Sequence, residues 1–185
     1  MDNCSVIDIF CGVGGLTQGF VREKFTVLAG IDADPACQYA FEKNNRAKFI
    51  NKKIEEIGPN EINDLYPKGK TKILVGCAPC QPFSSYTLKK SIDDNWKLLY
   101  QFAELITAVS PDIVSMENVT RLRLFADGKI FKDFVQTLES SGYYVSSFDV
   151  YCPDYCIPQK RTRLVLFASK LRKIELITKT HSPEN

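Results

Sequence analysis

The chain has 185 residues, of which 44% are hydrophobic and 25% are charged, values typical of one soluble globular domain. These fractions exclude intrinsic disorder as the main state of the chain. No stretch approaches the roughly 20 apolar residues that a membrane-spanning helix needs. The formal net charge of +2 is too small to indicate a polyanionic partner by itself.

Short apolar runs rich in β-branched residues alternate with longer amphipathic runs. In chain order they predict a strand at 4–10, a helix at 16–23, a strand at 25–32, a helix at 36–44, a strand at 72–76, a helix at 96–109, a strand at 111–116, a helix at 130–141 and strands at 143–151 and 163–169. This alternation predicts one α/β domain over residues 1–185, with a mostly parallel sheet covered by helices on both faces. Ligands of such sheets bind beyond the carboxyl ends of the strands.

The cysteine count bears on the compartment. Seven cysteines are present, and an odd number cannot form a complete set of intrachain disulfides. The N-terminal segment has no basic leader, and Asp8 interrupts its short apolar run, which argues against a secretory signal. We therefore expect a cytoplasmic protein with reduced thiols and no membrane segment.

A glycine turn (Gly12, Gly14 and Gly15) follows the first predicted strand and opens a helix. In that position backbone N–H groups can approach a ligand closely. Asp32 ends the next strand, where a carboxylate can accept hydrogen bonds from both hydroxyls of a ribose. A structural turn, with Asp32 as a helix cap, is the plainer interpretation. The combination favours an adenosine-bearing cofactor, and the spacing leaves a nicotinamide dinucleotide and S-adenosylmethionine both open.

A cysteine loop follows the strand at 72–76. Cys77 and Cys80 form a C-x-x-C motif, and Cys152 with Cys156 forms a second, looser pair. A zinc site and a redox dithiol are possible interpretations. The prolines around Cys80 and Pro153 inside the second pair argue against both. A single nucleophilic thiol at the mouth of the sheet is the remaining alternative.

An acidic residue and a basic run complete the candidate site. Glu117 directly follows the strand predicted at 111–116. At that position it can hydrogen-bond a heteroaromatic nitrogen or, alternatively, cap a helix. The segment 159–163 holds three basic residues in five, and arginine is suited to binding phosphates or carbonyl oxygens. A solvated charged surface is the alternative for this segment.

Together and in this order, the segments resemble the cytosine-5 DNA methyltransferase family. Residues 8–15 (DIFCGVGG) resemble its first motif, and Pro79-Cys80-Gln81 with Phe83-Ser84 resemble its catalytic loop. Residues 117–119 (ENV) resemble its acidic motif and 159–163 (QKRTR) its Q-x-R-x-R segment. The resemblance covers about residues 5–169, nearly the whole chain.

The resemblance implies a Rossmann-like methyltransferase fold that binds S-adenosylmethionine and yields S-adenosylhomocysteine. Phe10 would lie against the adenine, the glycine turn would approach the methionine part and Asp32 would hold the ribose. Leu99 falls where the family has a leucine near the adenine. Where the family often has an acid for the adenine amino group, this chain has Lys53, so recognition would depend on backbone groups or on Glu55.

The resemblance also implies the chemistry. A cytosine flipped out of double-stranded DNA would be attacked at C6 by the Cys80 thiolate, which makes C5 nucleophilic toward the methyl group. Glu117 would hydrogen-bond N3 of the ring, and Arg163 would lie near the base and favour the thiolate. The residues expected to contact nucleic acid are Gln81, Ser84, Ser85 and Arg161. No metal ion is expected.

Only 22 residues follow Arg163, too few for another domain of even ~50 residues. We expect a catalytic domain without a target-recognition region, hence a fragment, a subunit whose partner supplies the missing motifs, or a remnant. The leading hypothesis is the catalytic part of a DNA (cytosine-5-)-methyltransferase of a restriction-modification system. A tRNA cytosine-5 methyltransferase and a non-catalytic protein that binds the cofactor or a partner are the alternatives.

Overall fold

The structure is a computed structural model that describes residues 3–79 and 96–181. Its strands are β1 (Cys4–Ile9), β2 (Thr26–Asp32), β3 (Lys48–Asn51), β4 (Thr71–Gly76), β5 (Ile113–Asn118), β6 (Tyr144–Tyr151) and β7 (Thr162–Ser169). The α-helices are α1 (Gly15–Arg22), α2 (Gln38–Asn45), α3 (Pro59–Leu65), α4 (Lys97–Val109) and α5 (Lys129–Ser140). The 3₁₀ turns are η1 (Pro35–Cys37), η2 (Ile54–Glu56), η6 (Thr120–Arg123), η7 (Phe125–Gly128) and η8 (Cys152–Tyr155).

The strands form one sheet in the order β3-β2-β1-β4-β5-β7-β6. The pairs from β3 to β5 are parallel, whereas β7 is antiparallel to both β5 and β6. The chain order reverses at β1, which has β2 on one side and β4 on the other. The carboxyl ends of β1 and β4 therefore flank the crevice in which open α/β sheets bind ligands.

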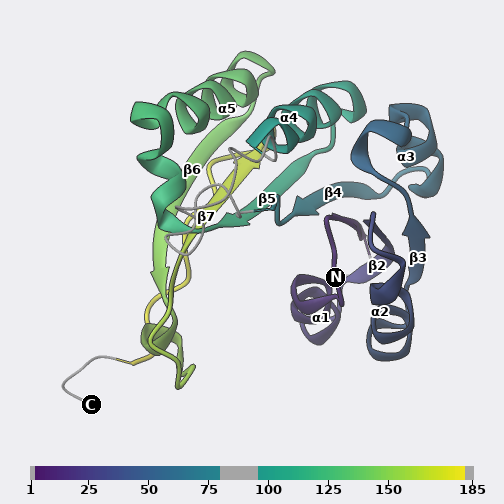
Figure 1. Cartoon of the computed structure of the whole chain (residues 1–185), viewed down its shortest axis with the longest axis horizontal. Coiled ribbons are helices and arrows are strands. Elements are labelled where there is room, and N and C mark those ends of the chain that lie inside the picture. Colours follow the sequence, from purple (N-terminus) through teal and green to yellow (C-terminus); the bar gives the residue numbers. More distant parts are fainter. Residues whose placement is uncertain (1–2, 80–95, 182–185) are drawn as a thin grey trace.

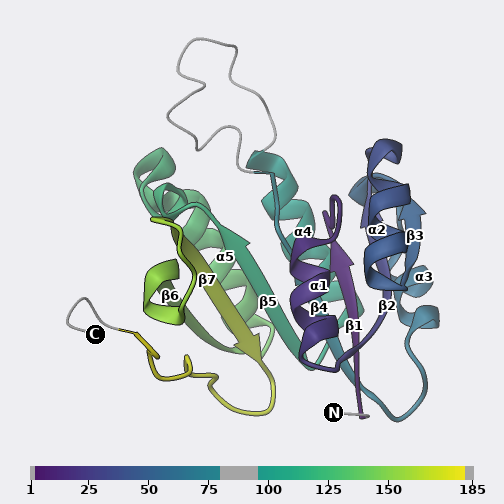
Figure 2. The ribbon, with the colours of Figure 1, turned by 90° about the horizontal axis from the view of Figure 1, so that it is seen from below.

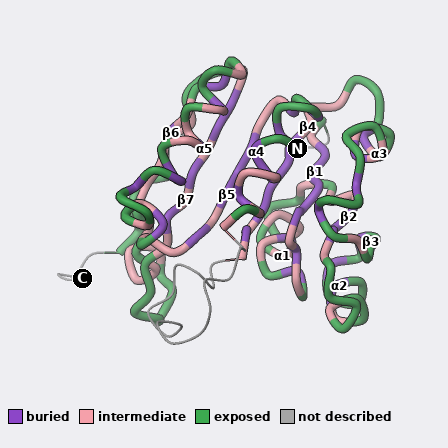
Figure 3. Tube along the Cα trace, turned by 45° about the horizontal axis from the view of Figure 1, so that its top comes forward, coloured by how far each residue is buried: buried purple, intermediate pink, exposed green. Residues whose placement is uncertain are grey.

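Helices lie on both faces of the sheet, as the sequence predicts. Figures 1 and 2 show α3, α4 and α5 on one face and α1 and α2 on the other, where they cover the half of the sheet that contains β1, β2 and β3. The largest core cluster joins the apolar side chains of the central strands to α4 and α5, and includes Ile7, Leu74, Phe102, Met116 and Phe134. The burial pattern in Figure 3 follows this arrangement, with the buried stretches concentrated in the central strands.

The predicted elements match the observed ones with two omissions. Each predicted strand lies within two residues of an observed one, and the helix predicted at 36–44 is η1 followed by α2. The sequence patterns miss β3 and α3. β3 has four residues with exposed polar ends, and α3 has seven residues of which only Ile62 is buried. Neither carries enough apolar periodicity to be recognised. None of the helices in the described part of the chain is long and apolar enough to cross a membrane.

Candidate active site

The predicted site residues gather at one edge of the sheet. The carboxyl ends of β1, β2, β4 and β5 reach this edge because these strands are parallel. The start of β7 reaches it as well, because β7 runs in the opposite direction. The site residues form two groups at this edge. One lines a pocket beside β1 and β2, and the other is the carboxylate cluster (Cys77, Glu117 and Arg163) beside β4, β5 and β7.

The glycine turn adopts left-handed backbone conformations that explain its composition. Gly12 and Gly14 have φ values of +51° and +89°, which L side chains rarely adopt. A Cβ on Gly14 would lie 2.1 Å from Nδ2 of Asn45, whereas a Cβ on Gly12 or Gly15 would meet nothing within 4 Å. Gly14 is therefore needed for packing. Gly12 and Gly15 leave open space in which another molecule can approach the backbone.

Asp32 ties the glycine turn to the end of β2. Its Oδ2 accepts a hydrogen bond from the backbone N–H of Gly12 at 2.8 Å, and its Oδ1 accepts one from the N–H of Asp34 at 2.9 Å. The cap of η1 is Asp34, whose Oδ1 accepts from the N–H of Ala36. The carboxylate of Asp32 is thus fixed in place at the rim of the pocket, and within the described residues each oxygen accepts one of these bonds and keeps a further lone pair.

The turn pocket is a cavity of about 300 Å³, and its lining residues are Ile9, Phe10, Ile31, Asp32, Ala33, Lys52, Lys53, Ile54, Glu55 and Leu98. Phe10 takes a left-handed conformation with φ of 60°, which is strained for an aromatic residue. Its ring packs edge-on against Phe102 with the centroids 6.0 Å apart. This conformation turns the chain at the end of β1 and leaves the ring in the wall of the pocket.

The leucine in the pocket wall is not the one that the sequence predicts. Leu99 is 1% exposed and packs in the main core, whereas Leu98 lines the turn pocket. One residue along a helix rotates a side chain by about 100°, because there are 3.6 residues per turn. Leu98 is therefore the leucine that lines this pocket, and the contact of Leu99 with an adenine stays a prediction.

Lys53, which departs from the family pattern, and Glu55, which could replace the missing acid, also line this pocket. Lys53 and Glu55 are exposed and flank Ile54 at the rim. The Nζ of Lys52 forms an ion pair with Glu61 at 2.8 Å, which holds the chain after β3 against α3. The lining of the pocket thus carries charges of both signs.

Asp8 lies behind the glycine turn and is fully buried. Its Oδ2 accepts a hydrogen bond of 2.6 Å from Oγ1 of Thr17, which connects β1 to α1, while its Oδ1 has no partner in the described part of the chain. Burial, with a smaller contribution from the negative charge of Asp32, raises the pKa of Asp8 from 3.8 to about 7. Burial likewise raises the pKa of the neighbouring Cys11 thiol well above its ordinary value.

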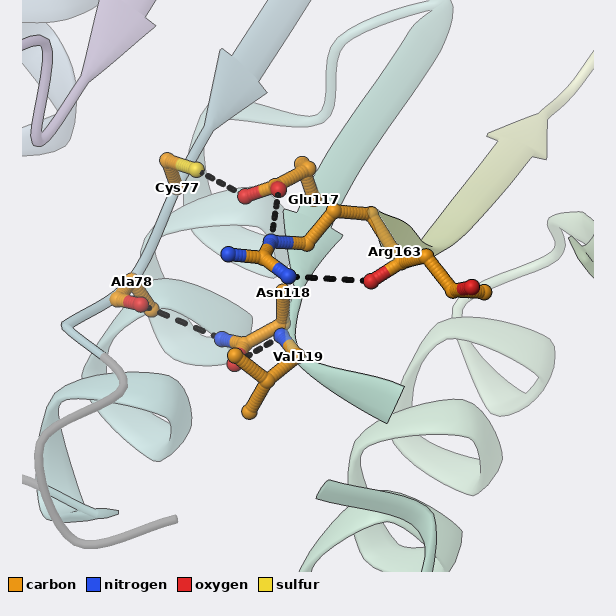
Figure 4. A network of polar contacts seen from close by, with 7 residues as sticks. Cys77, Ala78, Glu117, Asn118, Val119 and Arg163 are labelled. Atoms are coloured by element: carbon orange, nitrogen blue, oxygen red, sulfur yellow. Dashed lines mark hydrogen bonds and ion pairs between the residues drawn. The ribbon is translucent and has the colours of Figure 1, made fainter. Parts of the chain in front are cut away.

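The carboxylate cluster is drawn in Figure 4. Oε1 of Glu117 lies 3.0 Å from Nε of Arg163, and Oε2 of Glu117 accepts a hydrogen bond from Sγ of Cys77. The side chains of Glu117 and Arg163 are 26% and 25% exposed, so both are held while remaining reachable. Nη1 of Arg163 donates a hydrogen bond to the carbonyl of Thr162 at 2.9 Å, while Nε forms the ion pair with Glu117.

Strand register explains why these three residues meet. Gly76 pairs with Met116 between the parallel strands β4 and β5, so the next residues, Cys77 and Glu117, lie side by side. Glu117 pairs with Val165 across the antiparallel β5 and β7. Arg163 lies two residues before Val165 and so on the same face, a diagonal position that a long side chain can bridge.

Asn118, the next residue of β5, is 2% exposed and holds the segment that leaves β4. Its Nδ2 donates to the carbonyl of Ala78 at 3.1 Å, and its Oδ1 accepts from the N–H of Val119 at 2.8 Å. These bonds fix the chain immediately before Pro79 and Cys80. Asn118 therefore has a structural role, which is to hold the backbone that leaves β4.

Several predicted site residues lie elsewhere. Cys80, Gln81, Ser84 and Ser85 lie outside the described residues. Arg161 is exposed just before β7, and its carbonyl accepts a hydrogen bond from the N–H of Cys152. Within residues 3–79 and 96–181, no group of three or more His, Cys, Asp and Glu side chains is arranged to hold a metal ion.

Comparison with protein families gives one match that spans nearly the whole chain. A family model described as C-5 cytosine-specific DNA methylase matches residues 4–185. Among curated proteins, the Type II methylase M.HgiDII of Herpetosiphon aurantiacus is 57% identical over 98% of this chain and 51% of its own length. The Type II methyltransferase M.XorII of Xanthomonas oryzae is 29% identical over 89% of this chain and 40% of its own length. The chain thus spans about half the length of these relatives.

Solved structures match the fold at lower identity. The Entamoeba histolytica methyltransferase EhMeth superposes with a TM-score of 0.76 at 22% identity, over 98% of this chain and 58% of that one. The Dnmt2 methyltransferase of S. pombe superposes with a TM-score of 0.73 at 16% identity, over 94% and 51% of the two chains. The fold is therefore the Rossmann-like fold of methyltransferases.

Proposed function

The chain belongs to the C-5 cytosine-specific DNA methylases, and on that premise we propose that it is the catalytic part of a DNA (cytosine-5-)-methyltransferase. One observation supports this most directly. Glu117 and Arg163, from different strands, form an ion pair beside the exit of β4, from which Pro79-Cys80-Gln81 continue. An acid, a cation and a cysteine are the groups that addition to a pyrimidine ring requires, and the chain continues from this sheet edge into the segment that contains Cys80.

S-adenosylmethionine fits the turn pocket. Members of this family use it in general, and when bound it supplies the methyl group that C5 of the cytosine accepts. A cavity of about 300 Å³ with the fixed Asp32 carboxylate at its rim and the Phe10 ring in its wall suits an adenosine group. Asp32 would hold the ribose hydroxyls, and Phe10 and Leu98 would contact the adenine. The open space beside Gly12 and Gly15 would admit the methionine part.

The protein side chains would carry the remaining chemistry. The Cys80 thiolate would form a bond to C6 of a flipped cytosine, and Glu117 would hydrogen-bond N3, where charge develops during that addition. Arg163, 3.0 Å from Glu117, would keep the acid oriented and add positive charge near the thiolate. After methylation, loss of the C5 proton would let the Cys80–C6 bond break and return the thiolate.

Contacts to DNA form a separate part of the proposal. Gln81, Ser84 and Ser85 follow Cys80 in the sequence, and Arg161 lies exposed two residues before Arg163. Hydroxyl, amide and guanidinium groups of this kind bind phosphates and position a duplex. The chain spans about half of its relatives' length, and a target-recognition region, on the same protein or on a second subunit, would complete the contacts to DNA.

The test is transfer of a radioactive methyl group from S-adenosylmethionine to separate DNA and tRNA pools, with the purified chain alone and with extract from its source. We expect label in DNA, with extract if a partner is needed, and none with a Cys80→Ser chain. Label in tRNA alone would assign the substrate to RNA. An absence of label in every tube, with heat released on S-adenosylmethionine binding in calorimetry, would support a non-catalytic remnant.

A further inference from the structure

The first cysteine of the C-x-x-C motif contacts the acidic residue of the site. We propose that Cys77 is a positioning residue, which fixes the carboxyl group of Glu117 by donating its thiol hydrogen to Oε2. The inference rests on the proposed function, in which Glu117 faces the cytosine ring. It gives the motif a role that needs neither zinc nor a disulfide.

The contact follows from the sheet and not from a mobile side chain. Cys77 directly follows β4, and its backbone N–H donates to the carbonyl of Ile9 at 3.3 Å, so its main chain continues the strand pairing. The register places it beside Glu117, and its half-buried side chain points at that carboxyl group (Figure 4). The carboxyl group of Glu117 is therefore a fixed neighbour of the thiol at this position.

Glu117 needs a second contact because one contact does not fix a carboxyl plane. The terminal torsion of glutamate is soft and roughly two-fold, so the plane can turn about the last carbon–carbon bond. Arg163 approaches Oε1 through Nε, while its Nη1 donates to Thr162, so this pair lacks the two parallel bonds of a fork-shaped arginine contact. The thiol on Oε2 fixes the other oxygen and with it the plane.

A thiol suits this position because it orients the acid without changing its charge balance much. A second cation would bind the carboxylate strongly and compete with the ring nitrogen for it. An S–H group is a small, weak, neutral donor. It can hold the plane in the free protein and release the oxygen when the base arrives.

The hydrogen bond itself can be tested on the purified chain without any activity. The S–H stretching band lies apart from other protein bands and moves to lower wavenumber when the thiol donates. We expect the wild-type minus Cys77→Ser infrared difference to show a band below that of the exposed Cys156, which Cys156→Ser identifies, and expect it to rise in Glu117→Ala. A Cys77 band that is unchanged by Glu117→Ala would overturn the inference.

The consequence for the reaction needs the transfer assay. We expect Cys77→Ala to lower kcat about tenfold, the size of one lost hydrogen bond, with KM for DNA unchanged, and Cys77→Ser to recover most of it. The pH–rate profile should shift in Cys77→Ala and not in Cys156→Ser. Equal loss in Cys77→Ala and Cys77→Ser would indicate packing and overturn the positioning role. An inactive wild type would instead overturn the proposed function, and the infrared band would then decide the contact alone.

Discussion

At the end of β1 the candidate site is built mostly from backbone, whereas at the ends of β4 and β5 it is built from side chains that hold one another. The glycine turn leaves open space beside Gly12 and Gly15, and Asp32 is fixed by two backbone N–H donors. In the carboxylate cluster, Glu117 is held by Arg163 and Cys77. One half is therefore set by allowed backbone angles and the other by strand register.

Because the two halves are built differently, substitutions in them should affect different measurable properties. A change in the glycine turn alters the path of the backbone, so it affects folding and cofactor affinity together. A change in the carboxylate cluster removes a chemical group from a sheet that stays folded, so it affects the rate of transfer. The four predictions below test this separation, in order of decreasing expected effect.

Glu117→Gln should separate rate from folding most strongly. Loss of the acid at N3 should lower kcat by about 10²–10⁴, the usual contribution of a positioned general acid, while heat of S-adenosylmethionine binding and the denaturation midpoint stay close to those of the wild type. The matched control is Glu139→Gln on the exposed side of α5, which should leave all three unchanged. A transfer rate retained by Glu117→Gln would contradict the proposed role of this residue.

Asp8 should make the backbone half sensitive to pH. Its pKa is about 7 in the folded protein and 3.8 without burial, so between these values the folded state binds the extra proton. The free energy of unfolding should therefore fall as pH rises from about 4 to about 7 and then level off, with a contribution of up to about 4 kcal/mol.

The measurement is urea denaturation of the wild type and Asp8→Asn across this range. Asparagine keeps an acceptor for Thr17 and cannot ionise, so the difference between the two stability curves should isolate the Asp8 titration. Parallel curves would show that Asp8 does not carry a raised pKa in the folded protein.

Leu99→Ala and Leu98→Ala should have opposite consequences, although the residues are adjacent. Leu99 is 1% exposed in the core, so its truncation should cost about 2–5 kcal/mol of stability. Leu98 lines the turn pocket, so its truncation should weaken S-adenosylmethionine binding with little loss of stability. Calorimetry and denaturation of both variants decide this, and weakened binding in a folded Leu99→Ala protein would restore the contact that the sequence predicts.

Leu98 and Leu99 also illustrate how much of the site the sequence predicts. Long apolar runs predicted most of the sheet, and motif order placed Asp32, Glu117 and Arg163 at one edge, where the structure has them. The sequence does not tell which of Leu98 and Leu99 faces the pocket, because one residue along a helix rotates the side chain by about 100°. The partner of Cys77 was also beyond reach, since the register of β4 against β5 depends on tertiary packing and not on local pattern.

Gly14→Ala and Gly12→Ala test the backbone half at its finest scale. Both positions have positive φ, so alanine costs about 1–2 kcal/mol at either one. At position 14 the methyl group would also collide with Asn45 and Phe41, which should add roughly 1–3 kcal/mol of overpacking. At position 12 it would enter open space. Denaturation should therefore rank Gly14→Ala as the less stable variant. Calorimetry should show that Gly12→Ala loses more cofactor affinity than Gly14→Ala when each loss is compared with the same variant's loss of unfolding free energy. If the two variants lost affinity only in proportion to their stability, the space beside Gly12 would not be where the cofactor meets the backbone, and the turn would serve folding alone.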